Sequence, residues 1–321
     1  MMQWDKATFS RMAKDLGFVR DTFEKVFRLS EVLEFIQNDS FLAGRLALKG
    51  GTAINLTIFD LPRLSVDIDM DFCEDVARDE MLISRQEITK RIQKQMETLS
   101  YRLSPKSKMY HALDSFVYEY TNAGGVKDNL KIEINYMLRC HVLSPVRKDV
   151  VLPWPNQQLS VLIVDPLEIY ASKIVALLNR AAPRDLFDVE TMVHQGLFTD
   201  SQKTMLKKCV MFYFAIGSQN APETFCFDAL KLISQRRIKT DLVPVLRHGV
   251  QFDAENACEY VLNYLKETMK PDDQELMFWS EFNHKNYHPE LLFQDESILS
   301  RIAHHPMALW KCDKNRQELK R

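Results

Sequence analysis

The segment from Leu64 to Phe72 constrains the fold of this chain most strongly, because apolar and polar side chains alternate along it without a break. A period of two residues predicts a β-strand with one buried and one exposed face. The apolar face carries Val66, Ile68, Met70 and Phe72, and the polar face carries Ser65, Asp67, Asp69 and Asp71. The apolar side chains indicate a strand of the core, so the aspartates must point into something other than that core.

Asp67 and Asp69 lie side by side on the polar face, where like charges repel each other. A divalent cation removes this conflict, and two carboxylates together with phosphate oxygens suit Mg²⁺ or Mn²⁺. An isolated Asp-x-Asp pair on a solvated strand face is the alternative interpretation. An EF-hand loop starting at Asp67 is excluded, because its sixth and twelfth positions are Phe72 and Arg78 rather than glycine and glutamate.

The run Lys49-Gly50-Gly51-Thr52 precedes the strand and leads into a helical pattern. Two glycines let backbone N–H groups approach a phosphate closely, and a following helix adds the positive end of its dipole. A P-loop is excluded because the lysine comes before the glycines. A lone Gly-Gly-Thr is most simply a turn or a helix cap, but its combination with the aspartate pair predicts a nucleoside triphosphate site.

The rest of the chain divides into a mixed part and a helical part. Residues 115–120 and 130–137 alternate as strands around a glycine-containing stretch, which predicts a hairpin. Asp165, Pro166 and Glu168 suit the cap, the first position and the capping-box position of a helix, and helical periods dominate from there onward. We therefore expect an α+β protein with a catalytic domain over residues 1–160 and a helical domain over residues 161–321.

Composition excludes several classes of protein. Hydrophobic residues make up 46% and charged residues 27% of the 321 residues, with a net charge of −2, so any nucleic-acid contact must use a local basic patch. The six cysteines have no zinc-site spacing and are expected to be reduced thiols. No apolar run reaches the roughly 18 residues of a membrane span and no signal-peptide pattern is present, so we expect a cytoplasmic protein without a membrane partner.

The run from Lys49 to Ala53, followed by Arg63-Leu-Ser-Val-Asp67-Ile-Asp69, resembles the AbiEii/AbiGii toxin group of the DNA-polymerase-β-like nucleotidyltransferases. The resemblance implies a polymerase-β-like catalytic domain with a mixed sheet. It also implies a third carboxylate on a neighbouring strand. Glu133 is the favoured candidate, because its strand follows the hairpin and is expected to pair with the aspartate strand. Glu119 is the alternative.

The resemblance continues into the helical part, through Lys173, Arg180 and the run Arg184-Asp185-Leu-Phe-Asp188. Lys173 and Arg180 share one helix face, on the flank of its apolar stripe, and the two aspartates share a face of the next helix. Such a pattern fits either a structural ion-pair network or a clamp for a triphosphate. The resemblance favours the clamp.

As a whole, the resemblance implies a metal-dependent nucleotidyltransferase toxin of a toxin–antitoxin or phage-defence (abortive infection) system. Such an enzyme transfers a nucleoside monophosphate from an NTP to an acceptor, here expected to be the 3′ end of tRNA. A cognate antitoxin is the implied protein partner. The alternatives are a GTP-sensing partner without transfer activity and a transferase acting on a protein or a small molecule.

The implied roles divide the residues into three groups. Asp67, Asp69 and Glu133 hold Mg²⁺ or Mn²⁺, and Glu133 also helps to deprotonate the acceptor hydroxyl. The NTP phosphates are held by Lys49, Gly50, Gly51, Thr52 and Ser65. Lys173, with Arg180 or Arg184, neutralises the leaving pyrophosphate, while Asp185 and Asp188 orient Lys173 or the acceptor.

Overall fold

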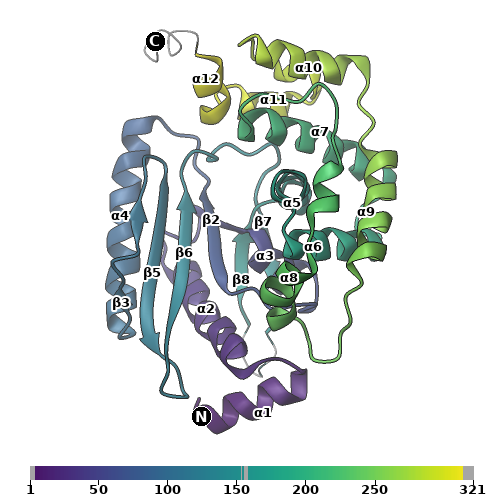
Figure 1. Ribbon diagram of the computed structural model, residues 1–321. Helices are drawn as coiled ribbons and strands as arrows, with labels where there is room; N and C mark the ends of the chain where they lie inside the picture. The colour runs from purple at the N-terminus through teal and green to yellow at the C-terminus, as the bar shows by residue number, and fades with distance from the viewer. Residues whose placement is uncertain (1–3, 153, 155–157, 314–321) are drawn as a thin grey trace. The chain divides into compact units, whose positions relative to one another are not determined.

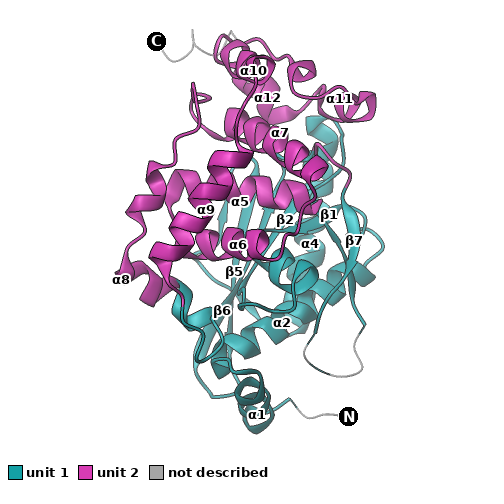
Figure 2. Ribbon diagram, turned by 90° about the vertical axis from the view of Figure 1, so that its right-hand side faces the viewer, with its two compact units in different colours: residues 1–139, 145–164, 242–251 teal, residues 140–144, 165–241, 252–321 magenta. Residues whose placement is uncertain are grey.

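The computed structural model describes residues 4–152, 154 and 158–313. The chain forms two compact units, coloured separately in Figure 2. Unit 1 comprises residues 1–139, 145–164 and 242–251, and unit 2 comprises residues 140–144, 165–241 and 252–321. Unit 1 holds the sheet and unit 2 is helical (Figure 1), which confirms the α+β class with a mixed sheet and a helical C-terminal part.

The sheet of unit 1 has eight strands within the described residues, in the order β3-β5-β6-β2-β1-β8-β7, with β4 beside β5. The strands are β1 (Leu46–Lys49), β2 (Asp67–Phe72), β3 (Arg102–Leu103), β4 (Lys108–Met109), β5 (Leu113–Thr121), β6 (Lys127–Asn135), β7 (Val146–Asp149) and β8 (Ser160–Ile163). Strand β2 runs parallel to β6 and antiparallel to β1, so the sheet is mixed at its centre.

Helices surround this sheet within unit 1. They are α1 (Lys6–Leu16), α2 (Arg20–Asn38), α3 (Gly50–Ala53), which continues as the π-helical turn η1 (Ile54–Ile58), and α4 (Arg78–Thr98). Helix α2 contacts β8, and α4 lies along the β3 and β5 side of the sheet (Figure 1). The alternation that predicted strand β2 is confirmed, since Ile68, Met70 and Phe72 are fully buried, although the strand begins at Asp67 rather than Leu64.

The predicted hairpin is also confirmed. Strands β5 and β6 pair antiparallel, and Asn122 closes the turn by accepting hydrogen bonds from the backbone N–H groups of Gly124 and Val126. The buried carboxylate of Glu24 on α2 accepts a further hydrogen bond from the N–H of Ala123. The turn is therefore attached to α2.

Unit 2 begins with α5 (Pro166–Arg180), whose N-terminus is capped by Asp165 as predicted. The capping-box role predicted for Glu168 is wrong. This fully buried carboxylate accepts hydrogen bonds from the N–H groups of Val142 and Leu143 instead, because the segment 140–144 packs against α5. The remaining helices are α6 (Pro183–His194), α7 (Asp200–Gly217), α8 (Gln235–Arg237), α9 (Ala254–Thr268), α10 (Asp273–Asn283), α11 (Glu296–Ile302) and α12 (Pro306–Cys312), joined by short 3₁₀ and π turns.

Two expectations from composition can be compared with the described residues. All six cysteines are free thiols, as expected. Across the described ranges, no helix has the length and apolarity needed to cross a bilayer.

A buried ion pair attaches α4 to the sheet and generates the first prediction. Arg85 donates to both carboxylate oxygens of Asp114, whose side chain is 0% exposed. Replacing Arg85 with methionine leaves that carboxylate buried without its cation, so the free energy of unfolding should fall by about 3–5 kcal/mol. Urea denaturation at pH 7 measures this loss.

Arg91 provides the control on the same helix. Its side chain is 37% exposed and pairs with Asp39 and Glu87, so Arg91→Met should cost less than about 1 kcal/mol. Equal losses for the two variants would show that the buried pair does not attach α4 to the sheet.

Candidate active site

The sheet places Asp69 between two charged residues on neighbouring strands. Asp69 is in register with Lys49 on β1 and with Glu133 on β6, and Asp67 is in register with Lys131. Residues in register on adjacent strands project from the same face, about 4.8 Å apart along the hydrogen-bonding direction. The parallel pairing of β2 with β6 therefore brings both predicted aspartates and Glu133 to one face of the sheet.

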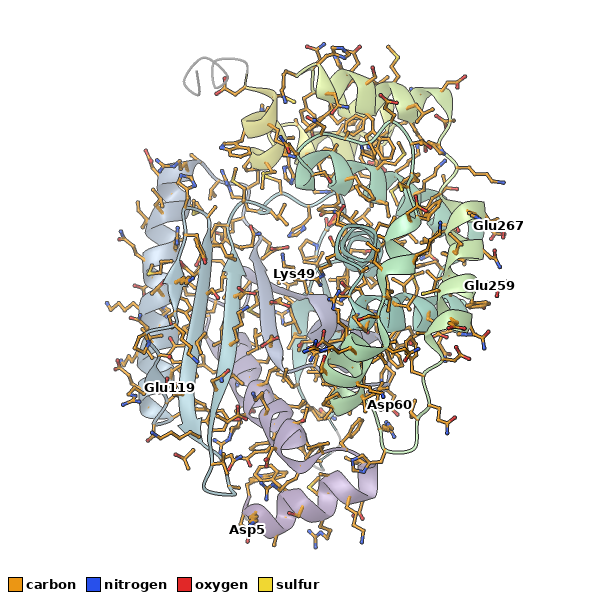
Figure 3. The ribbon with its side chains drawn as sticks, viewed as in Figure 1. Asp5, Lys49, Asp60, Glu119, Glu259 and Glu267 are labelled. Atoms are coloured by element: carbon orange, nitrogen blue, oxygen red, sulfur yellow. The ribbon has the colours of Figure 1, made fainter. Side chains whose placement is uncertain are left out.

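Glu119 lies elsewhere on the sheet (Figure 3). It is on β5, where Ser115 rather than Glu119 is in register with Glu133, so Glu119 is displaced by four residues, or about 13 Å along the strand. Its carboxylate binds the Arg102 guanidinium at 2.8 Å and the Ser104 hydroxyl at 2.7 Å, and these contacts lower its pKa. The geometry brings Glu133, and not Glu119, to the aspartates.

Gly50 lies directly against this carboxylate group, and Gly51 lies against Arg63 and Ser65. Gly50 has φ +68°, and a Cβ atom there would come within 2.8 Å of the Asp69 Oδ2 atom. A Cβ at Gly51 would lie 2.7 Å from an Arg63 guanidinium nitrogen and 3.0 Å from the Ser65 hydroxyl. An added side chain at Gly50 would meet both a strained φ and the Asp69 carboxylate, whereas at Gly51 it would require the Arg63 guanidinium to shift.

Thr52 and Lys49 make contacts that sequence reasoning did not foresee. Thr52 is fully buried and its hydroxyl donates to the backbone oxygen of Asp67. The Lys49 ammonium binds the buried Asp71 carboxylate at 2.5 Å. Both side chains therefore bond to strand β2 and hold the Gly-Gly turn against it.

Two further basic residues belong to this group and were missed as site residues. Arg63 is 2% exposed, donates to the Leu64 carbonyl oxygen and lies against Gly51. Lys131 forms an ion pair with Glu133 at 2.9 Å. Partial burial acts to lower the pKa of Lys131, but the carboxylates of Glu133, Asp67 and Asp69 outweigh it and raise the pKa. The only sequence signal for Lys131 was its alternation with Glu133, and Arg63 carried no signal beyond its place in the motif.

The carboxylates can be tested as a metal site. Within the described ranges, no three or more His, Cys, Asp or Glu side chains are arranged to hold a metal ion by themselves. Asp67 and Asp69 nevertheless supply two adjacent hard oxygen ligands on one face, and Mg²⁺ usually takes one or two carboxylates together with waters and substrate phosphates. The donor set thus fits a cation that arrives with its nucleotide, but it does not form a closed protein cage.

The residues predicted in the helical part form a second cluster, inside unit 2. The Lys173 ammonium lies 3.0 Å from Asp185 and 3.1 Å from Asp188, and Arg180 binds Asp185 at 2.8 Å. The predicted faces of α5 and α6 therefore meet. Lys173 is only 8% exposed, because the two aspartates of α6 cover it.

The electrostatics around Asp185 favour its charged form. Burial acts to raise the pKa of Asp185, but Lys173 and Arg180 outweigh it and hold the pKa below its ordinary value. Arg184 donates to the backbone oxygen of Asp241. The cluster contains Lys173, Arg180, Asp185 and Asp188.

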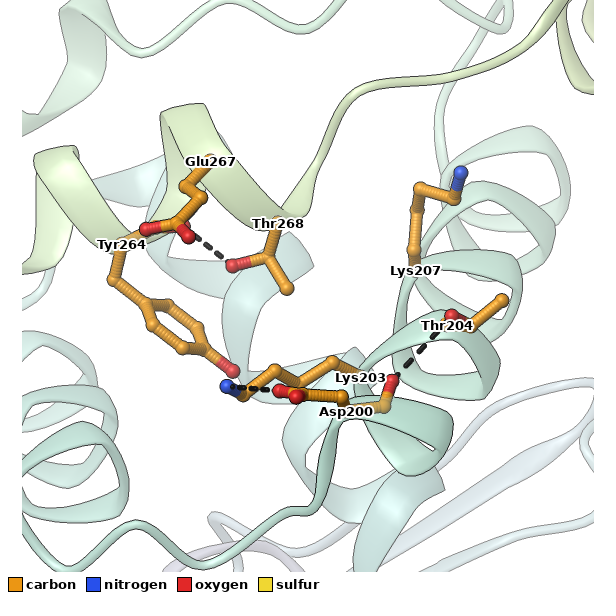
Figure 4. Close-up of a pocket in the computed structure, with 7 residues that line it drawn as sticks. All are labelled: Asp200, Lys203, Thr204, Lys207, Tyr264, Glu267 and Thr268. Atoms are coloured by element: carbon orange, nitrogen blue, oxygen red, sulfur yellow. Dashed lines mark hydrogen bonds and ion pairs between the residues drawn. The ribbon is translucent and has the colours of Figure 1, made fainter.

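A separate pocket in unit 2 contains none of the predicted residues (Figure 4). It measures about 250 Å³ and is lined by α7 and α9. Its two lysines are already bonded within the chain, Lys203 to Asp200 and Lys207 to Glu275. Both lysines of this pocket therefore already have carboxylate partners.

Comparison with known proteins defines the class. The sequence model of the family described as nucleotidyl transferase AbiEii toxin, type IV toxin–antitoxin system, matches residues 34–254, which is more than half of the chain. The chain belongs to this family and is a nucleotidyltransferase.

Among solved structures, the chain is similar to MenT4, the nucleotidyltransferase toxin Rv2826c from Mycobacterium tuberculosis H37Rv. The TM-score is 0.64 at 15% identity, and the match covers 96% of this chain and 99% of that one. At this identity the similarity shows a shared fold. No curated protein sequence matches the chain.

The close approach of Gly50 to Asp69 yields the second prediction. In Gly50→Ala the positive φ is strained and the new Cβ displaces the Asp69 carboxylate, so the free energy of unfolding should fall by about 1–2 kcal/mol. Mn²⁺ binding, followed by electron paramagnetic resonance, should weaken in the same variant. Gly44→Ala is the control, since no heavy atom lies within 4 Å of its added Cβ. A Gly50→Ala protein that matches Gly44→Ala in both measurements would contradict this account of the turn.

The third prediction concerns Lys173. Lys173→Met leaves the side chains of Asp185 and Asp188, each 1% exposed, without their shared cation. We expect the free energy of unfolding at pH 7 to fall by about 3–5 kcal/mol. The lowered pKa of Asp185 means that its ion pairs stabilise the wild-type protein above the unfolded pKa of about 3.9, and that this stabilisation disappears as the pH falls. The difference between wild type and variant should therefore shrink on acidification.

Arg180→Met is the matched control, because the Arg180 side chain contacts the same Asp185 but is 63% exposed. It should cost less than about 1 kcal/mol. Denaturant unfolding of wild type and both variants from about pH 2 to pH 7 makes the comparison, and a Lys173→Met loss independent of pH would rule out the aspartates as its cause.

Proposed function

We propose that this nucleotidyltransferase transfers a nucleoside monophosphate from an NTP to a hydroxyl acceptor. The acceptor oxygen attacks the α-phosphorus, a new phosphorus–oxygen bond forms, and the bond to the bridging oxygen of the β-phosphate breaks. Pyrophosphate leaves with that electron pair. The observation that carries the proposal is the position of Asp69, between the Gly50 turn on one side and Glu133 on the other.

The residues of unit 1 are proposed to bind the metal, to bind the phosphates and to accept the proton. Asp67 and Asp69 would hold Mg²⁺ or Mn²⁺, which supplies positive charge to the phosphates of the bound NTP. The backbone of Gly50 and Gly51 and the hydroxyl of Ser65 would hold phosphate oxygens, since a turn that leads into a helix presents N–H groups to anions. Glu133 would accept the proton from the acceptor hydroxyl.

Lys49 and Thr52 take positioning roles in this proposal. The ion pair of Lys49 with Asp71 and the hydrogen bond of Thr52 to the Asp67 backbone join the Gly-Gly turn to the aspartate strand. Each contact limits how far the turn can move relative to Asp67. A phosphate held by the turn and a cation held by the aspartates then keep a fixed separation.

Lys173, with Arg180 or Arg184, is proposed to neutralise the leaving pyrophosphate. The orientation of the Lys173 ammonium by two buried carboxylates supports a charge held in one place, which is what stabilises developing negative charge. Asp185 and Asp188 are proposed to provide this orientation. Because Lys173 is buried, the exposed Arg180 is the better residue for testing the role by substitution.

The favoured acceptor is the 3′ end of tRNA. Support comes from exposed basic residues in unit 2, namely Arg236 and Lys239 beside Arg237, which donates to the backbone oxygens of Arg180 and Ala181 at the end of α5. Since the chain as a whole has a charge of −2, phosphate contacts need such a local patch. A protein or small-molecule acceptor, or nucleotide sensing without transfer, would not need it.

The family assignment also supports a biological setting. As a toxin of a type IV toxin–antitoxin family, the protein is proposed to act in the cytoplasm, to slow growth when its antitoxin is absent, and to serve in defence against phage. The antitoxin is its proposed protein partner.

The fourth prediction tests transfer directly. Purified protein is incubated with each α-labelled NTP, Mg²⁺ and separated cellular RNA and protein fractions, and label should enter the tRNA fraction. Glu133→Gln should lower the rate of transfer at least about a hundredfold, because it removes the proton acceptor. Glu119→Gln, which removes a carboxylate bonded to Arg102, should leave the rate unchanged.

The same experiment separates the alternatives. Label in the protein fraction would identify a protein acceptor. Metal-dependent binding of NTP by calorimetry, without any pyrophosphate release, would favour a nucleotide sensor. Equal rates for Glu133→Gln and wild type would remove Glu133 from the reaction.

A further inference from the structure

One cation lies in the middle of the carboxylate group that the proposed function uses. Lys131 is in register with Asp67 and forms an ion pair with Glu133 two positions along its own strand. Asp69 is in register with Glu133 and lies on the same face of the sheet. A single cationic side chain therefore shares a face with all three carboxylates assigned to the metal and to the acceptor proton.

The charges of this face explain why a lysine is stable there. Three carboxylates on two adjacent strands repel one another, and at an effective dielectric constant of about 20 each close pair interacts strongly. The side chains of Lys131 and Glu133 are 37% and 27% exposed, so water screens the interaction only in part. The long, flexible lysine stem lets the ammonium reach carboxylates on both strands.

We propose that Lys131 is the built-in counter-cation of the carboxylate site. Its ammonium neutralises the carboxylates in the absence of nucleotide and competes with the divalent metal for them. The inference rests on the proposed function, because it takes Asp67 and Asp69 as the metal ligands. It adds a residue that positions the carboxylates, and it implies that the metal binds the free protein weakly.

The charge of Lys131 couples the binding of the metal to the binding of the nucleotide. A metal that binds Asp67 and Asp69 brings a second positive charge next to the Lys131 ammonium, and the two repel each other. A triphosphate arriving with the metal supplies anionic oxygens that relieve this repulsion. Metal and nucleotide should therefore bind with positive coupling, and release of the Glu133 carboxylate from Lys131 would leave that carboxylate able to accept a proton.

The test measures Mn²⁺ binding to the nucleotide-free, full-length protein by electron paramagnetic resonance. Lys131→Met removes the charge but keeps the length of the side chain, and it should tighten Mn²⁺ binding about tenfold, as expected for one partly screened unit charge. Lys131→Arg keeps the charge and should stay within about threefold of wild type. Lys127→Met is the matched control, because Lys127 lies exposed on the same strand, four residues or about 13 Å away.

A second readout separates charge from packing. In Lys131→Met the carboxylates lose their counter-cation, so the melting temperature should fall without metal and recover at saturating Mn²⁺. A merely structural lysine would give the same fall without recovery. Lys127→Met should show neither effect.

The outcomes distinguish a failure of the proposed metal site from a failure of the role proposed for Lys131. If the Asp69→Asn protein binds Mn²⁺ as tightly as the wild-type protein does, the proposed metal site itself is wrong. If Asp69→Asn abolishes binding but Lys131→Met and Lys127→Met behave alike, the metal site stands and the role of Lys131 is overturned. Weaker binding in Lys131→Met than in wild type would also overturn it.

Discussion

The fold of unit 1 has to accommodate several like charges on two adjacent strands. Strand β2 contributes Asp67, Asp69 and Asp71, and β6 contributes Glu133 at the register position of Asp69. Such a face is stable only with cations close by, and the sheet provides Lys49 for Asp71 and Lys131 for Glu133. The apolar sides of the same strands are fully buried, so the core fixes the strands while the lysines offset the repulsion.

Local patterns were sufficient for much of this arrangement. The alternation before Phe72 predicted β2, the residues around Asn122 predicted the β5–β6 hairpin, and Asp165 predicted the start of α5. Each of these signals depends on neighbours in sequence, through side-chain period, turn chemistry or capping. The spacing of Asp185 and Asp188 likewise placed both on the face of α6 that meets Lys173.

What the sequence did not reveal depends on contacts between distant segments. The place of Lys131 in the site follows from the parallel register of β2 with β6, and no local pattern sets the register of strands so far apart. The burial of Arg63 depends on packing around Gly51, and the assignment of residues 140–144 to unit 2 depends on Glu168. Glu168 looked like part of a cap because its position suits one, but a buried carboxylate binds whichever N–H groups the fold brings to it.

The two charged clusters differ in burial, and this difference decides what a substitution in each can report. Lys173, Asp185 and Asp188 are almost completely buried, so removing one of them changes stability before it changes chemistry. Lys131 and Glu133 are partly exposed, so a substitution there acts mainly on the charge that a ligand meets. With the role proposed for Lys131, the carboxylate face would fold without metal, and exchange of the lysine for a metal–nucleotide pair would become part of substrate binding. The triphosphate would then do more than supply the transferred group, because its negative charge would make the exchange favourable.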